Sequence, residues 1–120
     1  MVAHALRAVP LECCGFLIGR DDDVFCSVEM DNAEASPVRY RISDEEHLEL
    51  RRMLRRATPP LVILGVYHSH PGGEAQLSPT DIAEAHYPDW VHLVIGLGGH
   101  QPVVRAFDIA AGAVRSVTLR

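Results

Sequence analysis

Two histidines separated by one residue, His68 and His70, are followed after a short loop by a carboxylate at Asp81. Zinc accepts imidazole nitrogen and carboxylate oxygen as ligands, and a site with three protein ligands leaves its fourth tetrahedral position to water. An open position of this kind is typical of catalytic zinc, because the metal lowers the pKa of the water and polarises a carbonyl oxygen. The residue types and their spacing therefore predict a catalytic zinc site.

The segments on either side of the histidines are the elements that must position them. Residues 61–67 are β-rich and almost wholly apolar, which favours a buried strand that delivers both histidines to the end of a sheet. Because side chains alternate along a strand, the two imidazoles should share one side, and Ser69 should point to the other and support the loop. Ser78 and Pro79 are typical of the N-cap and first position of a helix, which places Asp81 in its first turn.

Each of these residues also has a simpler interpretation. Ser78 and Asp81 fit a capping box, and a single histidine is more often a core or surface residue than a ligand. The combination of a strand, an HxH triplet, a Gly-containing loop and an Asp in the first helical turn favours metal binding. His92 lies within the apolar run 90–96 and is interpreted as a core or sheet-face histidine, because the other three residues already complete a catalytic set.

A longer pattern connects these residues to a known family. The run HSHP, six residues, Ser, two residues and Asp resembles the JAMM signature of the JAB1/MPN/Mov34 metalloproteases, with no departure in spacing. That family also has an upstream glutamate in a segment like ExCG, and the segment ECCG that begins at Glu12 stands in the matching place. The resemblance implies that His68, His70 and Asp81 bind zinc. It also implies that Glu12 is the general base and that the Ser78 hydroxyl stabilises the oxyanion.

The resemblance further implies an activity and a substrate. Members hydrolyse an amide at the C-terminal Gly-Gly of ubiquitin or a ubiquitin-like protein, and the compact prokaryotic type resembles this chain most. Eukaryotic members carry insertions that grip ubiquitin, for which 120 residues leave little room. The expected substrate is therefore the tail of a ubiquitin-like or β-grasp sulfur-carrier protein. A partner activating enzyme of sulfur metabolism and an oligomeric state both stay open.

Two other functions are alternatives to a zinc isopeptidase. A non-catalytic MPN scaffold would be expected to lack some of the five motif residues, and all five are present. A zinc amidohydrolase acting on small molecules is the second alternative. A deaminase of small bases would need HxE together with PCxxC, and the sequence contains no PCxxC. Without the family match, Glu12 alone would be interpreted as a surface residue.

Composition limits the class of protein. A length of 120 residues suits a single domain over residues 1–120, and no run approaches the roughly 18 apolar residues of a membrane span. The formal charge of −5 implies no strongly cationic face, which argues against nucleic-acid binding. Cys13, Cys14 and Cys26 form no CxxC pair and are interpreted as small buried hydrophobic residues. Reduced cysteines and the lack of an apolar leader predict a cytoplasmic protein.

The order of the elements predicts the fold class. We expect an α+β fold, a three-layer α/β/α sandwich with a mixed central sheet, which agrees with the JAB1/MPN, deaminase-like fold that the resemblance implies. Helices are expected over residues 2–9 and 79–86 and from the cap Ser43 to just before Pro59. Strands are expected over residues 14–18, 24–30, 38–42, 61–67, 90–96, 103–109 and 114–119.

Overall fold

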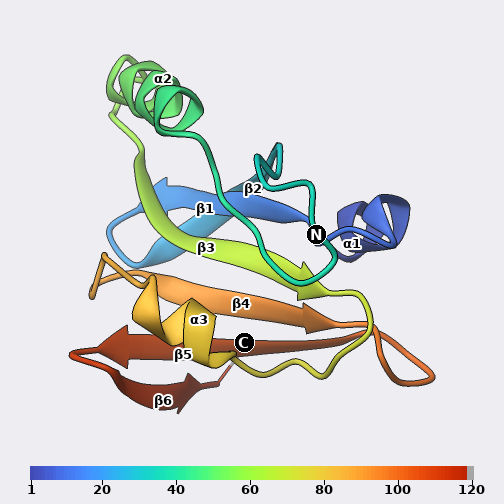
Figure 1. Ribbon diagram of the computed structural model, residues 1–120. Helices are drawn as coiled ribbons and strands as arrows, with labels where there is room; N and C mark the ends of the chain where they lie inside the picture. Colours follow the sequence, from blue (N-terminus) through green and yellow to red (C-terminus); the bar gives the residue numbers. More distant parts are fainter. Residues whose placement is uncertain (119–120) are drawn as a thin grey trace.

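The computed structural model describes residues 1–118, which form a six-stranded sheet accompanied by three helices (Figure 1). The helices are α1 (Val2–Ala8), α2 (Asp44–Arg55) and α3 (Pro79–Ala83). The strands are β1 (Cys14–Arg20), β2 (Asp23–Met30), β3 (Val62–His70), β4 (Val91–Gly96), β5 (Val103–Ala110) and β6 (Ala113–Val117). Their order across the sheet is β2-β1-β3-β4-β5-β6.

The sheet is mixed, as predicted. Strand β1 pairs antiparallel with β2 and with β3, β3 pairs parallel with β4, and β4, β5 and β6 form an antiparallel meander. A parallel pair cannot be joined by a tight turn, so residues 71–90, which include α3, cross over between β3 and β4. This connection brings α3 back beside the end of β3 that contains the histidines.

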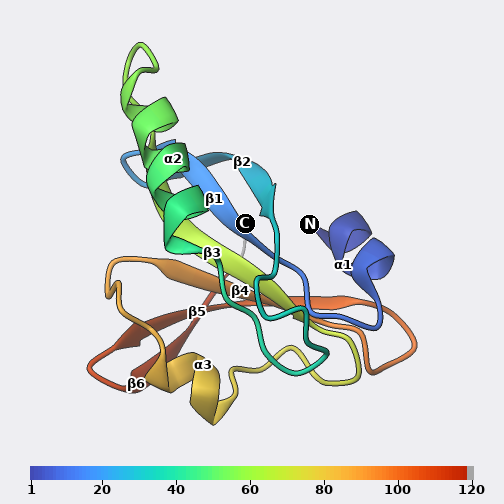
Figure 2. The same ribbon diagram turned by 45° about the horizontal axis from the view of Figure 1, so that its top comes forward.

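The helices cover both faces of the sheet, which gives the expected three layers. On one face, Leu54 of α2 packs against a cluster that includes Phe16 of β1 and Val66 of β3. On the other face, Ala5 of α1 packs against Cys13 and Ile95. In both views α1 lies beside the end of the sheet where β1 begins and β3 ends (Figures 1 and 2). The α+β fold class is confirmed.

One predicted strand is wrong. Residues 38–42 have no strand geometry and form an irregular segment between β2 and α2. Their alternation has another cause: Val38 is 75% exposed, whereas Tyr40 and Ile42 pack against the apolar cluster under α2. The N–H of Arg41 donates to the side-chain oxygen of Asn32 at 3.0 Å instead of to a neighbouring strand.

Several predicted boundaries also shift. Strand β3 extends to His70, so the two histidines belong to the strand and not to a loop after it. Helix α3 ends at Ala83 and not near residue 86, because the chain turns back and Tyr87 stacks on Trp90 with the rings 4.0 Å apart. The last strand ends at Val117, and the predicted end at Leu119 lies outside the described residues.

The cysteine prediction is correct for two residues and wrong for the third. Cys13 and Cys14 are buried, whereas Cys26 is exposed on β2, which is an edge strand of the sheet. None of the helices within residues 1–118 is long and apolar enough to span a bilayer. The longest of them, α2, has 12 residues.

Candidate metal centre

The end of β3 fixes the direction of its two histidine side chains. Strand alternation places His68 and His70 on the same face of the sheet and Ser69 on the opposite face, as predicted. His68 and Ser69 are fully buried, and His70 lies next to the glycine that ends β4, since His70 pairs with Gly96. A side chain at Gly96 would collide with the backbone of Ala75, so the loop after His70 lies close to β4.

Three donor atoms converge on one point above this face. The Nε2 atoms of His68 and His70 are 3.1 Å apart, and Oδ2 of Asp81 lies 3.1 Å from the first and 3.3 Å from the second. Two ligand atoms that bind one zinc ion at about 2.0–2.1 Å with tetrahedral angles are roughly 3.3 Å apart. The donor types and their separations therefore fit a zinc ion.

Helix α3 orients the carboxylate. The N–H of Asp81 donates to Oγ of Ser78 at 3.1 Å, and the N–H of Ser78 donates to Oδ2 of Asp81 at 2.8 Å, which is a complete capping box. The capping interpretation of this pair is thus confirmed. It does not compete with metal binding, because the Oδ2 atom that accepts from Ser78 is also the atom that faces both imidazoles.

Asp81 is held in its ionised form. Burial alone would raise the pKa of its carboxyl group, but hydrogen bonds with His68 and His70 outweigh burial and lower the pKa below its ordinary value. An ionised carboxylate accepts hydrogen bonds and binds metal, and it does not need to lose a proton first. The site therefore presents an anionic oxygen between two imidazole nitrogens.

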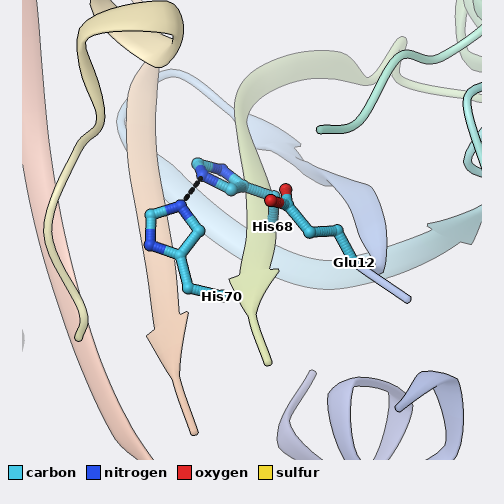
Figure 3. Close-up of side chains that lie close together, drawn as sticks. All are labelled: Glu12, His68 and His70. Atoms are coloured by element: carbon cyan, nitrogen blue, oxygen red, sulfur yellow. Dashed lines mark hydrogen bonds between the residues drawn. The ribbon is translucent and has the colours of Figure 1, made fainter. Parts of the chain in front are cut away.

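Glu12 lies in the short connection between α1 and β1 and is only 4% exposed. One ligand atom each of Glu12, His68 and His70 lie within 4.8 Å of one another (Figure 3). The Glu12 Oε1 atom is buried and has no hydrogen-bond partner. A buried carboxylate oxygen without a partner is costly, so a water molecule or a cation beside it would stabilise this arrangement. The structure thus rules out the alternative interpretation of Glu12 as a surface residue.

Burial raises the pKa of Glu12 to about 7, with His70 opposing the shift and the negative charge of Asp81 adding to it. A carboxyl group whose pKa lies near the working pH can both accept and return a proton. The arrangement can therefore combine metal binding with acid–base chemistry.

The outer partners of the two histidines differ. Nδ1 of His70 lies 3.0 Å from the carbonyl oxygen of Glu74, which can only accept, so Nδ1 carries a proton and Nε2 is the ring nitrogen left to bind a metal. Nδ1 of His68 is buried without a partner, and the ring instead stacks on Tyr40, with centroids 4.5 Å apart and planes 20° from parallel. Sequence reasoning missed Tyr40, because residues 38–42 were assigned to a strand.

His92 is buried on β4 and does not belong to the donor group of Glu12, His68 and His70. Burial lowers the pKa of its imidazole, which favours the neutral form. Its position matches the predicted sheet-face histidine.

The chain is similar to known proteins over nearly its whole length. The family model for prokaryotic homologs of the JAB domain matches residues 1–110. The CysO-cysteine peptidase of Mycobacterium tuberculosis is 38% identical over 117 residues, which are 95% of this chain and 79% of that protein. A probable TtuB-protein conjugate cleaving protease of Thermus thermophilus is 34% identical over 110 residues, which are 92% of this chain and 70% of that protein.

A solved structure shows the same fold. The solution structure of a protein from Desulfitobacterium hafniense superimposes with a TM-score of 0.85 at 33% identity, over 98% of this chain and 82% of that one. The match to the family model, the identity to its curated relatives and the shared fold agree with one another. The chain belongs to the family of prokaryotic homologs of the JAB domain.

Proposed function

We propose that this protein is a zinc-dependent peptidase that hydrolyses an amide at the C-terminal Gly-Gly of a ubiquitin-like or sulfur-carrier protein. The observation on which the proposal rests is the convergence of Nε2 of His68, Nε2 of His70 and Oδ2 of Asp81 within 3.1 to 3.3 Å of one another. A buried carboxylate, Glu12, lies beside them.

His68, His70 and Asp81 would hold the zinc ion. When bound, zinc lowers the pKa of a water molecule and polarises the carbonyl group that the water attacks. Two of the three protein groups are pre-oriented in this chain. The Glu74 carbonyl fixes the ring of His70, and the capping box fixes the carboxylate of Asp81.

Glu12 is the proposed general base. Its buried carboxylate takes a proton from the attacking water and later gives it to the leaving amine. The pKa of about 7 supports this role, because a carboxyl group of that strength is about half ionised at neutral pH and can both accept a proton and return it.

Ser78 is the proposed donor to the oxyanion. Its Oγ atom accepts the N–H of Asp81, which uses a lone pair and leaves the hydroxyl proton free to donate. Capping and oxyanion stabilisation are therefore compatible in one side chain. Removal of a single oxyanion donor costs about 2.7–4 kcal/mol of transition-state stabilisation in other enzymes.

The substrate class rests on the relatives and on the size of the chain. The two curated relatives are named for cleavage of a CysO-cysteine adduct and of TtuB-protein conjugates. In this chain only 13 residues, 31–43, connect β2 to α2, so no large insertion is available there to grip a folded ubiquitin. A Gly-Gly tail can approach a buried centre closely because it has no side chains. A non-catalytic scaffold is disfavoured, since all five motif residues are present.

Mass spectrometry of a defined adduct tests the proposal. The substrate is a β-grasp carrier that ends in Gly-Gly followed by one amino acid or a short peptide, and the control has Ala-Val in place of Gly-Gly. We expect cleavage after Gly-Gly at micromolar enzyme, much slower cleavage of the Ala-Val control and slow cleavage of ubiquitin chains. Cleavage at another bond, or equal rates on both carriers, would leave only an unspecified zinc amidohydrolase.

A further inference from the structure

The side chain of Asn32, two residues after the end of β2, uses its complete hydrogen-bonding capacity. Its Nδ2 group donates to the carbonyl oxygens of Glu12 at 3.1 Å and Arg39 at 2.8 Å. Its Oδ1 atom accepts the N–H groups of Glu34 and Arg41, both at 3.0 Å. An amide has two N–H donors and two acceptor lone pairs, so all four are engaged. No other side chain of this size offers that combination.

Two of these bonds act on the segment that carries Tyr40. The amide binds the backbone of Arg39 on one side of Tyr40 and of Arg41 on the other. Tyr40 in turn stacks on His68 and is partly buried against the apolar cluster under α2. Asn32 therefore fixes the backbone on both sides of Tyr40, whose ring stacks on His68.

A third bond acts on Glu12. The Glu12 carbonyl accepts from Asn32, and the Glu12 N–H donates to the carbonyl of Ser36 at 2.8 Å within the same segment. The next residue, Cys13, is bound to Ser69 between the two histidines, where its N–H donates to Oγ at 2.8 Å. The backbone of Glu12 is thus held between β3 on one side and the segment organised by Asn32 on the other.

We propose that Asn32 is a positioning residue for the hydrolytic reaction, because one amide sets both the Glu12 carboxylate and the Tyr40 ring against His68. This inference rests on the proposed function, in which Glu12 is the base. The four hydrogen bonds of the Asn32 side chain all go to backbone atoms, and none goes to a proposed zinc ligand. Its loss should therefore affect turnover while zinc stays bound.

Two substitutions separate this role from general support of the segment. Asn32→Ala removes all four hydrogen bonds. Asn32→Asp keeps the size and the oxygen that accepts from Glu34 and Arg41, but it cannot donate to Glu12 and places a negative oxygen against two carbonyls. The matched control is Ser36→Ala, which removes the bond from the Val38 N–H to Ser36 Oγ in the same segment. That control leaves the backbone bond between Glu12 and Ser36 in place.

The first readout is steady-state hydrolysis of the Gly-Gly carrier adduct together with zinc content. Both Asn32 variants should lose about 10- to 100-fold in kcat, because a misplaced base no longer has its reactive geometry, with zinc content and KM close to the parent values. Ser36→Ala should stay within roughly twofold of the parent. Parent-like kcat in Asn32→Ala would overturn the proposal.

The second readout is a double-mutant cycle with Glu12→Gln. If Asn32 acts through the Glu12 carboxylate, Asn32→Ala should change the residual turnover of Glu12→Gln by less than about twofold. If Asn32 only supports the fold, the two losses multiply. Multiplied losses would show that Asn32 does not act through Glu12 and would contradict that part of the proposal.

The third readout does not depend on activity. Hydrogen exchange of the Glu12 backbone N–H, which donates to the Ser36 carbonyl, should be about tenfold faster in Asn32→Ala and unchanged in Ser36→Ala. If the parent fails to cleave the adduct, the proposed function is wrong, and this exchange measurement still decides whether Asn32 holds Glu12. Unchanged exchange in Asn32→Ala would overturn the positioning role.

Discussion

The hydroxyl oxygen of Ser69 accepts a hydrogen bond from the N–H of Cys13 at 2.8 Å, and the N–H of Ser69 donates to the carbonyl of Cys13 at 3.1 Å. Ser69, between the two proposed zinc ligands, is therefore joined by two hydrogen bonds to Cys13, the residue after the proposed base Glu12. Because side chains alternate along β3, His68 and His70 can face the proposed metal site only while Ser69 faces this backbone. The HxH triplet thus sets the distance from the ligands to Glu12.

Ser69→Ala should destabilise the fold. The substitution leaves the buried N–H of Cys13 without an acceptor, which costs about 1–3 kcal/mol in free energy of unfolding. Urea denaturation measures the loss. Ser116→Ala, at an exposed position on β6, is the matched control and should stay within about 0.5 kcal/mol of the parent. Equal stability of both variants would show that the Cys13 N–H finds another acceptor.

Asp81→Ala should lose most of the zinc. It removes the one anionic ligand and also the oxygen that closes the capping box with Ser78. Elemental analysis after purification without chelators should find about one zinc per chain in the parent and in the control Asp89→Ala, whose side chain is exposed. Zinc retained in Asp81→Ala at the parent level would remove Asp81 from the ligand set.

Substitutions of Ser78 should separate its two roles. Glycine is a nearly equivalent N-cap, so Ser78→Gly costs only a few tenths of a kcal/mol in stability but removes the hydroxyl donor. We expect kcat to fall by about 10²–10³ in Ser78→Gly with zinc retained, and Ser78→Thr to keep most of the activity. Turnover of Ser78→Gly near the parent rate would confine Ser78 to capping.

The parts of the site that lie close together in sequence could be predicted from the sequence. His68, His70 and Asp81 belong to one strand-loop-helix segment, where strand alternation and the Ser78-Pro79 helix start determine their directions. The capping box and the mixed sheet followed from the same local patterns, and the structure bears them out.

The parts that depend on distant contacts could not be predicted in this way. Glu12 is buried because α1, β1 and the segment after β2 meet there, and no local pattern around Pro10 indicates it. The alternation of residues 38–42 arises because Tyr40 and Ile42 pack against the apolar cluster under α2, where Tyr40 also stacks on His68, and not from strand pairing. The backbone groups of Arg39 and Arg41 form hydrogen bonds with the side chain of Asn32 and not with a neighbouring strand.

Glu12→Gln tests the central claim most directly, because it keeps the size of the side chain and removes only its ability to accept a proton. Parent and variant are loaded with zinc, analysed for metal content and assayed on the same Gly-Gly carrier adduct. The account predicts equal zinc content and a loss of turnover of about 10²-fold or more in the variant. Turnover of zinc-loaded Glu12→Gln close to that of the parent would contradict the account and exclude Glu12 as the base.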